Sequence, residues 1–154
     1  MHRLIYTSRS ICDLSAAEIS QILETSRRSN EKDGITGLLV YHNRRVLQVL
    51  EGPEDSVDRC FQRIKQDPRH QNVAIMSKEP ASSRVFSNWF MGYQNPSALR
   101  VTDPNVAMTI ERLQRRLLEV ADVDTTAGKK AVIRKLSLFL MSAATGDRFG
   151  RQMA

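Results

Sequence analysis

The chain has 154 residues, of which 41% are hydrophobic and 26% are charged, and its formal net charge is +6 at pH 7. This length allows one domain with a buried core, and no segment approaches the roughly 20 apolar residues of a membrane span. Two cysteines make no disulfide framework and the N-terminus lacks an apolar signal core, so we expect a cytoplasmic protein. The basic residues are dispersed as short pairs such as Arg27-Arg28, which is typical of a solvated surface and disfavours nucleic-acid binding.

The first expected strand covers residues 2–8. Side chains on a strand alternate between its two faces, so Leu4, Tyr6 and Ser8 share one face. Tyr6 therefore points in the direction of a leucine, which predicts that its ring is buried.

A helix is expected over residues 15–30. Ser15 followed by Glu18 three residues later is a capping box, which marks the start of a helix. The apolar stripe that follows reaches Ser26 and Asn30 after further turns. The buried face of this helix thus becomes polar toward its C-terminal end.

Two strands are expected over residues 34–42 and 45–51, joined by a short polar hairpin turn at residues 42–44. The second of them has valine and leucine on both sides of Gln48, the pattern of a strand covered on both faces. A buried amide without partners costs roughly 1–3 kcal/mol, so Gln48 needs hydrogen-bonding groups around it.

A second helix is expected between Gly52-Pro53 and Asp67-Pro68, followed by strands over residues 71–79 and 86–92. The element order βαββαββ predicts an α+β fold, a ferredoxin-like sandwich with both helices on one face of the sheet. In that topology the first and third strands are central neighbours.

The predicted fold brings four buried polar groups toward one place: Tyr6, Ser26, Asn30 and Gln48. One interpretation is that each is a core polar residue satisfied by the protein itself. The other is that together they form the wall of a slot for a polar ligand. Four such groups in one region favour the ligand slot.

The C-terminal part is expected to form two helices, over about residues 104–121 and 128–143. We divide the chain into a domain of residues 1–95, a helical extension of residues 96–145 and a frayed tail of residues 146–154. Apolar residues of the first tail helix repeat at steps of four and three, as in a coiled-coil seam: Val106, Ile110, Leu113, Leu117 and Val120. We expect the tail helices to pack on the sheet face that the first two helices leave open, with a dimer or partner contact as the alternative.

Six stretches of this sequence resemble the BLUF domain family, the flavin-binding blue-light sensors. They are RLIYTS, SRRSN, GITGLLVY, VLQVLEG, DPRH and FSNWFMG, in the family's order and spacing over about residues 2–94. The resemblance implies a ferredoxin-like domain that holds an isoalloxazine ring between its two helices and has no enzymatic turnover.

The resemblance also implies photochemical roles. Tyr6 matches the family's electron and proton donor, and Gln48 matches the glutamine whose hydrogen bonds rearrange in the light. Trp89 and Met91 match residues of the fifth strand that relay this change. The remaining matches are cofactor contacts, which together with Tyr6 and Gln48 are Ile22, Ser26, Arg27, Asn30, Arg69 and His70.

The implied cofactor is FAD, with FMN as the alternative, and no metal is expected. The implied output is a signal to a downstream protein, and we expect a homo-oligomer. The competing hypothesis is a ferredoxin-like module that is not photoactive and binds nucleic acid or protein. RNA binding on such a sheet uses exposed aromatic residues on the central strands, where this sequence offers only Tyr6. An acyl-phosphate hydrolase would need an anion-binding glycine loop, which Ser8-Arg9-Ser10 does not provide.

Overall fold

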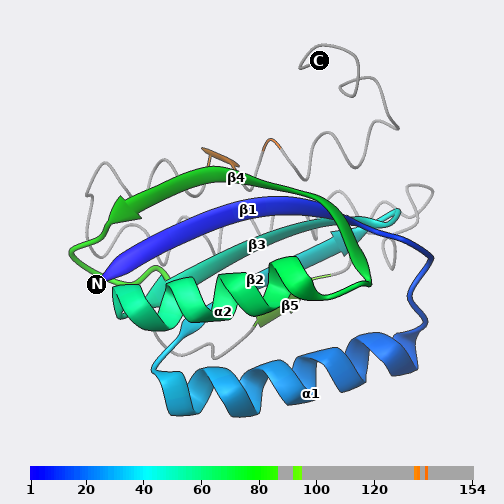
Figure 1. The fold of residues 1–154 in the computed structure, drawn as a ribbon, viewed down its shortest axis with the longest axis horizontal. Coiled ribbons are helices and arrows are strands. Elements are labelled where there is room, and N and C mark those ends of the chain that lie inside the picture. The colour runs from blue at the N-terminus through cyan, green and yellow to red at the C-terminus, as the bar shows by residue number, and fades with distance from the viewer. Residues whose placement is uncertain (87–91, 95–133, 136–137, 139–154) are drawn as a thin grey trace, which may run out of the picture. The chain divides into compact units, whose positions relative to one another are not determined.

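The computed structural model describes residues 1–86, 92–94, 134–135 and 138, and divides the chain into two compact units, Met1–Gln94 and Asn95–Ala154. In the described part of the chain, no helix is long and apolar enough to cross a membrane. The elements of the first unit are β1 (His2–Ser10), α1 (Ala16–Asp33), β2 (Thr36–His42), β3 (Arg45–Gly52), α2 (Glu54–Gln66), β4 (His70–Pro80) and β5 (Gly92–Gln94) (Figure 1).

The strands form one sheet in the order β4-β1-β3-β2-β5, in which β5 pairs with β2 in parallel and the other pairs are antiparallel. Both helices lie on the same face of this sheet (Figure 1). The predicted ferredoxin-like α+β sandwich is therefore confirmed. Of the two helices predicted for the tail, the first lies outside the described residues, and the second is described only at residues 134–135 and 138, which are helical.

The last predicted strand, over residues 86–92, differs from the structure at its start. Phe86 lies in a bend, because its backbone N–H donates to the Glu51 carboxylate instead of joining a strand ladder. The strand is described over Gly92–Gln94, and residues 87–91 lie outside the described part.

Helix α1 begins where the sequence predicts and ends at Asp33, three residues beyond the predicted end. Ser15 and Glu18 form the capping box in both directions, with the Ser15 N–H 2.8 Å from Glu18 Oε2. At the other end Gly34 adopts a left-handed conformation with φ of +65° and donates to the Asn30 carbonyl, which ends the helix. This cap fixes the last turn of α1, and with it Asn30.

Strands β2 and β3 approach each other closely, and their sequences allow it. A Cβ atom at Gly37 would lie 1.9 Å from the Val49 carbonyl oxygen, so this position accepts no side chain without a backbone shift. The hairpin between the strands turns at Asn43 and Arg44, whose φ angles of +48° and +65° are those of a type I′ turn.

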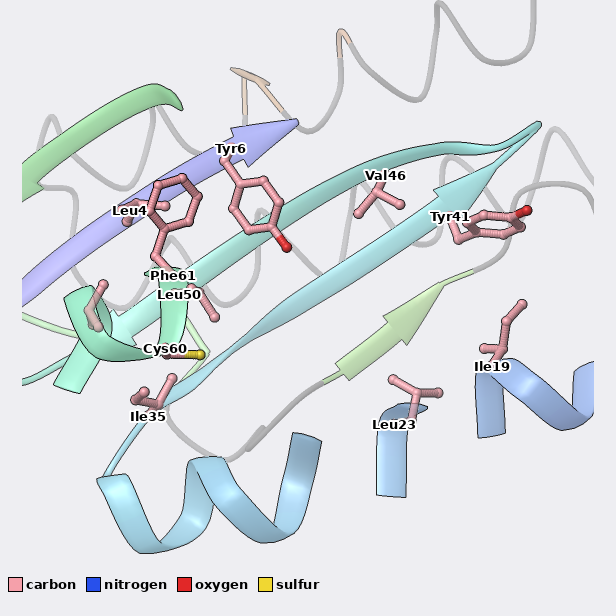
Figure 2. Close-up of a cluster of buried hydrophobic side chains, with 11 residues drawn as sticks. Leu4, Tyr6, Ile19, Leu23, Ile35, Tyr41, Val46, Leu50, Cys60 and Phe61 are labelled. Atoms are coloured by element: carbon pink, nitrogen blue, oxygen red, sulfur yellow. The ribbon is translucent and has the colours of Figure 1, made fainter. Parts of the chain in front are cut away.

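The hydrophobic core lies between the helices and the sheet. Leu4 and Tyr6 of β1 pack there with Leu23 of α1 and Phe61 of α2, and the Tyr6 and Phe61 rings lie 5.2 Å apart between centroids (Figure 2). The opposite face of the sheet is also buried along β1, β2 and β3, where its apolar side chains are at most 1% exposed: Ile5, Leu38, Val40, Leu47 and Val49. Strand β3 is thus covered on both faces, as its apolar run predicts.

Candidate functional site

A cavity of about 240 Å³ lies between α1, α2 and the helix-facing side of the sheet. Its walls combine apolar side chains with a few polar ones, a composition typical of small-molecule sites. The lining includes Tyr6, Tyr41 and Gln48 from the sheet, Ile22, Ser26 and Asn30 from α1, Cys60 from α2, Asp67 and Arg69 between α2 and β4, and His70 at the start of β4.

Tyr6 and Gln48 stand side by side in this wall. They are directly paired in the register of β1 and β3, and the Tyr6 hydroxyl donates a hydrogen bond to Gln48 Oε1. Tyr6 is fully buried and Gln48 is 7% exposed. Burial raises the pKa of the Tyr6 phenol above its ordinary value, with a further contribution from Asp67, so the phenol keeps its proton at neutral pH.

The sequence left two interpretations of Gln48 open, and the structure supports part of each. The amide oxygen has a protein partner in the Tyr6 hydroxyl, as a satisfied core residue would. The same side chain also lines the cavity. A glutamine amide offers an acceptor at one end and a donor at the other, so it can present either to a ligand.

Asn30 occupies the end of the cavity near the C-terminus of α1. It is 2% exposed, and the Cys60 thiol of the facing helix α2 lies 3.9 Å from its Oδ1 atom. Burial raises the pKa of Cys60, which keeps this thiol protonated and able to donate a weak hydrogen bond. The two helices thus meet through a neutral polar contact at the cavity wall.

Charged groups gather between α2 and β4. Asp67 Oδ1 lies 2.9 Å from both the backbone N and Nε of Arg69, and these hydrogen bonds lower the pKa of the Asp67 carboxyl. His70 Nδ1 lies 2.8 Å from the Ser8 hydroxyl. Burial lowers the pKa of His70, so the imidazole is neutral at pH 7.

The structure brings together every predicted cofactor contact except one. Arg27 is exposed on α1 and does not line the cavity. Successive helix residues point about 100° apart, so the residue after the inward-facing Ser26 turns outward. Trp89 and Met91 lie outside the described residues.

Sequence reasoning missed several lining residues, among them Tyr41, Cys60 and Asp67. Tyr41 lies two positions after Leu39 on β2, so the strand period that marks the cavity face would have found it. Cys60 falls inside the second predicted helix, and Asp67 marks the end of that helix. No local signal shows that these two face a cavity, because that depends on how α2 is placed against α1.

These residues suit a flavin. The apolar side chains Ile22 and Tyr41 can cover a flat ring, while Asn30, Ser26 and Gln48 offer buried polar atoms to its edge. Arg69 could offer its cation to a phosphate. A ferredoxin-like sandwich with such a cavity beneath its helices is a domain that binds a small planar ligand.

The chain belongs to the BLUF family, sensors of blue light using FAD, whose family model matches residues 1–92. Over 87 residues it is 39% identical to the photoactivated adenylate cyclase subunit beta of Euglena gracilis, which covers 56% of this chain and 10% of that protein. Over 83 residues it is 34% identical to the blue light- and temperature-regulated antirepressor BluF of Escherichia coli K12, covering 54% of this chain and 21% of that protein. The chain thus spans only a minor part of these relatives.

Solved structures agree with this family. The dark-state structure of the BLUF protein BlrB matches with a TM-score of 0.63 and 31% identity, covering 90% of this chain and 96% of BlrB. BlrP1 of Klebsiella pneumoniae matches with a TM-score of 0.68 and 26% identity, covering 91% of this chain and 32% of BlrP1. The chain is therefore a BLUF-family domain, with Tyr6 and Gln48 in its cavity wall.

Proposed function

We propose that this domain is a flavin-binding blue-light photoreceptor, in which Tyr6 is the electron and proton donor and Gln48 is the switch. The observation that carries the proposal is the hydrogen bond from the buried Tyr6 hydroxyl to Gln48 Oε1 at the wall of the cavity. It joins a proton donor to a group that can exchange its hydrogen-bond pattern.

A bound flavin would supply a group that absorbs blue light and accepts one electron when excited. Tyr6 would give up that electron together with its phenolic proton, which burial keeps on the phenol in the dark. Gln48 accepts the hydrogen bond of that proton, and turning its amide or converting it to the imidic tautomer would exchange the donor and acceptor it presents. The electron and the proton would then return to Tyr6, and the new orientation of Gln48 would remain as the signal.

The other predicted contacts are proposed to hold the cofactor, which we take to be FAD, with FMN as the alternative. Asn30 and Ser26 would bind the polar edge of the ring, and Arg69 and His70 the ribityl and phosphate end. Because Asp67 already binds Arg69, this end carries less positive charge than Arg69 alone would give. We assign Arg27 an outer position, since its side chain is exposed.

The output is proposed to be a signal to a separate protein, with no catalytic turnover by this chain. The route would run from Gln48 through Trp89 and Met91 to the tail helices. We propose that these helices cover the second face of the sheet. We also propose that the protein is a homo-oligomer. A shift between two populated conformations is sufficient for such a signal. We place the protein in the cytoplasm, where free Cys12 and Cys60 stay reduced.

The proposed function is tested by flavin binding and a light-minus-dark absorption spectrum. Purified protein mixed with FAD or FMN should retain the flavin through gel filtration, and blue light should shift its absorption band to the red, reversibly in the dark. Comparing the retained fraction of the two flavins decides between them. A protein that retains neither, or that retains flavin without a reversible shift, would contradict the proposal.

A further inference from the structure

The last turn of α1 carries Asn30 at the cavity wall, and the backbone after the helix holds that turn in place. Gly34 and Ile35 both donate their backbone N–H groups to the Asn30 carbonyl oxygen, the latter at 2.8 Å. This pattern is a usual way for a helix to end. The position of Asn30 therefore depends on what fixes the backbone at Gly34.

An arginine from a distant part of the chain binds this helix end. Arg84 Nη2 lies 2.7 Å from the Gly34 carbonyl oxygen, and the two residues are 50 positions apart in the sequence. The carbonyl groups at the C-terminus of a helix carry a partial negative charge, so a guanidinium cation is favourable there. Arg84 thus stabilises the end of α1 from outside the helix.

The same guanidinium also binds the strand that carries Gln48. Arg84 Nη1 lies 2.7 Å from the carbonyl oxygen of Glu51 in β3, and 2.7 Å from the Thr36 hydroxyl oxygen at the start of β2. The N–H donors of a guanidinium lie in one plane at fixed angles. A single rigid group therefore joins the end of α1 to β3, and these two elements place Asn30 and Gln48 in the cavity wall.

The backbone on either side of Arg84 is itself fixed by a buried ion pair. Arg3 Nη2 lies 2.9 Å from the Ser83 carbonyl oxygen, and the Val85 N–H lies 2.9 Å from Glu51 Oε2. Arg3 is 2% exposed, Glu51 is fully buried, and Arg3 Nε lies 2.6 Å from Glu51 Oε1. Charged hydrogen bonds in such a place are strong and costly to break. The Arg84 side chain thus extends from a backbone that is held on both sides.

We propose that Arg84 is a positioning residue of the flavin site, which sets where Asn30 lies relative to Gln48. The inference rests on the proposed function, in which Asn30 binds the edge of the flavin ring and Gln48 is the switch. Arg84 itself does not line the cavity. Its effect on a ligand must therefore pass through residues that do, and a site whose groups are held in place in advance binds more tightly.

The test is a double-mutant cycle on the affinity for FMN, titrated in the dark into flavin-free protein and followed by flavin fluorescence. Asn30→Ala removes the amide, and Arg84→Met removes the guanidinium but keeps an unbranched side chain. Each should raise the Kd for FMN by about 5-fold, the effect of one neutral hydrogen bond. Because Arg84 acts through Asn30, the double variant should bind about as weakly as Asn30→Ala alone.

The absorption band of bound FMN at saturating concentration gives a second readout, which a loss of protein stability alone would not change. Hydrogen bonds to the ring edge shift this band, so Arg84→Met should shift it in the same direction as Asn30→Ala. Arg28→Met is the matched control, because Arg28 lies on the same helix, is 70% exposed and pairs with Glu24. The control should keep the Kd and the band of the unmodified protein.

Two results would overturn the inference. One is a double variant in which the two fold-changes in Kd multiply, since Arg84 and Asn30 would then act independently. The other is an unshifted band in Arg84→Met. Arg84→Lys keeps the test decisive if Arg84→Met does not fold. It retains a cation but cannot reach the separate acceptors as a guanidinium does, so it should change the Kd and the band in the same direction by less.

Thiol labelling of the flavin-free protein separates this inference from the proposed function. Cys60 lies 3.9 Å from Asn30 Oδ1 and is buried, while the exposed Cys12 is an internal reference. Arg84→Met should label Cys60 faster than Arg28→Met does, by more than the change in its unfolding equilibrium, measured with urea, accounts for. If the unmodified protein binds no flavin, the proposed function fails. Equal Cys60 labelling rates in the two variants would instead show that Arg84 does not hold the end of α1.

Discussion

Strands β1 and β3 place a polar pair on each face of the sheet, and the two pairs differ in charge. Toward the helices, Tyr6 and Gln48 form a neutral hydrogen bond in the wall of a cavity. On the other face, Arg3 and Glu51 form an ion pair that also binds the backbone of residues 83–86. All four side chains are at most 7% exposed, so burial alone does not distinguish the pairs.

The difference in charge suits the proposed role of Gln48 as the switch. A neutral hydrogen bond contributes about 1 kcal/mol net, so an amide can exchange one partner for another at little cost. Leaving a buried charge without its partner costs about 3–5 kcal/mol. The same two strands thus carry an amide that can exchange hydrogen bonds, Gln48, on one face. On the other face they carry the Arg3–Glu51 ion pair, which holds its hydrogen-bond partners in place.

Tyr6→Phe should give the largest effect, a complete loss of the photocycle. The change removes the hydroxyl that supplies the proton and keeps the ring that packs on Phe61, so flavin binding should be nearly unchanged. Transient absorption after a blue flash measures the signalling yield.

Tyr41→Phe is the matched control for that variant. Tyr41 lines the same cavity, but its hydroxyl accepts a hydrogen bond from the Leu14 backbone N–H and has no part in the proposed proton transfer. It should keep its photocycle. An undiminished signalling yield in Tyr6→Phe would mean that another residue is the donor.

Glu51→Leu should have the next largest effect, a loss of stability of about 3–5 kcal/mol, because it leaves the Arg3 charge buried and unpaired. Urea unfolding of the flavin-free protein measures it. The control is Glu54→Leu, which removes an exposed carboxylate whose ion pairs are worth only about 0–1 kcal/mol. An equal decrease in the free energy of unfolding in the two variants would contradict the claim that the Arg3–Glu51 ion pair stabilises this face of the sheet.

Removing both charges should cost less than removing one. In Arg3→Met with Glu51→Leu no buried charge remains, and such replacements are often neutral or stabilising. The Val85 and Phe86 N–H groups still lose their acceptor, which costs about 1–3 kcal/mol each if they stay buried. Urea unfolding should therefore place the double variant above Glu51→Leu and below the unmodified protein. A double variant less stable than Glu51→Leu would show that the charge is not the dominant factor.

His70 should give the smallest effect, a dependence of stability on pH. Because burial lowers its pKa below the ordinary value of about 6.5, the unfolded chain binds a proton between the two pKa values and the folded chain does not. The free energy of unfolding should therefore fall as the pH drops below about 6.5. His70→Gln should show a smaller decline than the unmodified protein in urea titrations across that range. An identical decline would assign it to other groups.

The sequence predicted the cavity face better than the opposite face. Gln48 could be placed because an amide inside an apolar run must be buried, and its neighbour Tyr6 followed from the strand order of a ferredoxin-like fold. Asn30 followed from the helix period. Each of these predictions combined a local sequence pattern with the strand order of the ferredoxin-like fold.

The ion pair could not be predicted in this way. Glu51 is read from sequence as a charge near the end of a strand, and its burial depends on Val85, 34 positions later, returning to the same face. No periodicity encodes that contact. Arg27 was predicted as a cofactor contact from the family resemblance alone. The helix turns its side chain outward, which the resemblance does not show.

The central claim is that Gln48 stores the light signal in its hydrogen bonds. The most direct test is the light-minus-dark absorption spectrum of flavin-loaded Gln48→Leu, beside Gln62→Leu, which makes the same change at an exposed position of α2. Ring burial supplies most of the flavin affinity, so both variants should be yellow. Gln62→Leu should show the reversible red shift and Gln48→Leu should show none. A normal, reversible shift in Gln48→Leu would contradict the account.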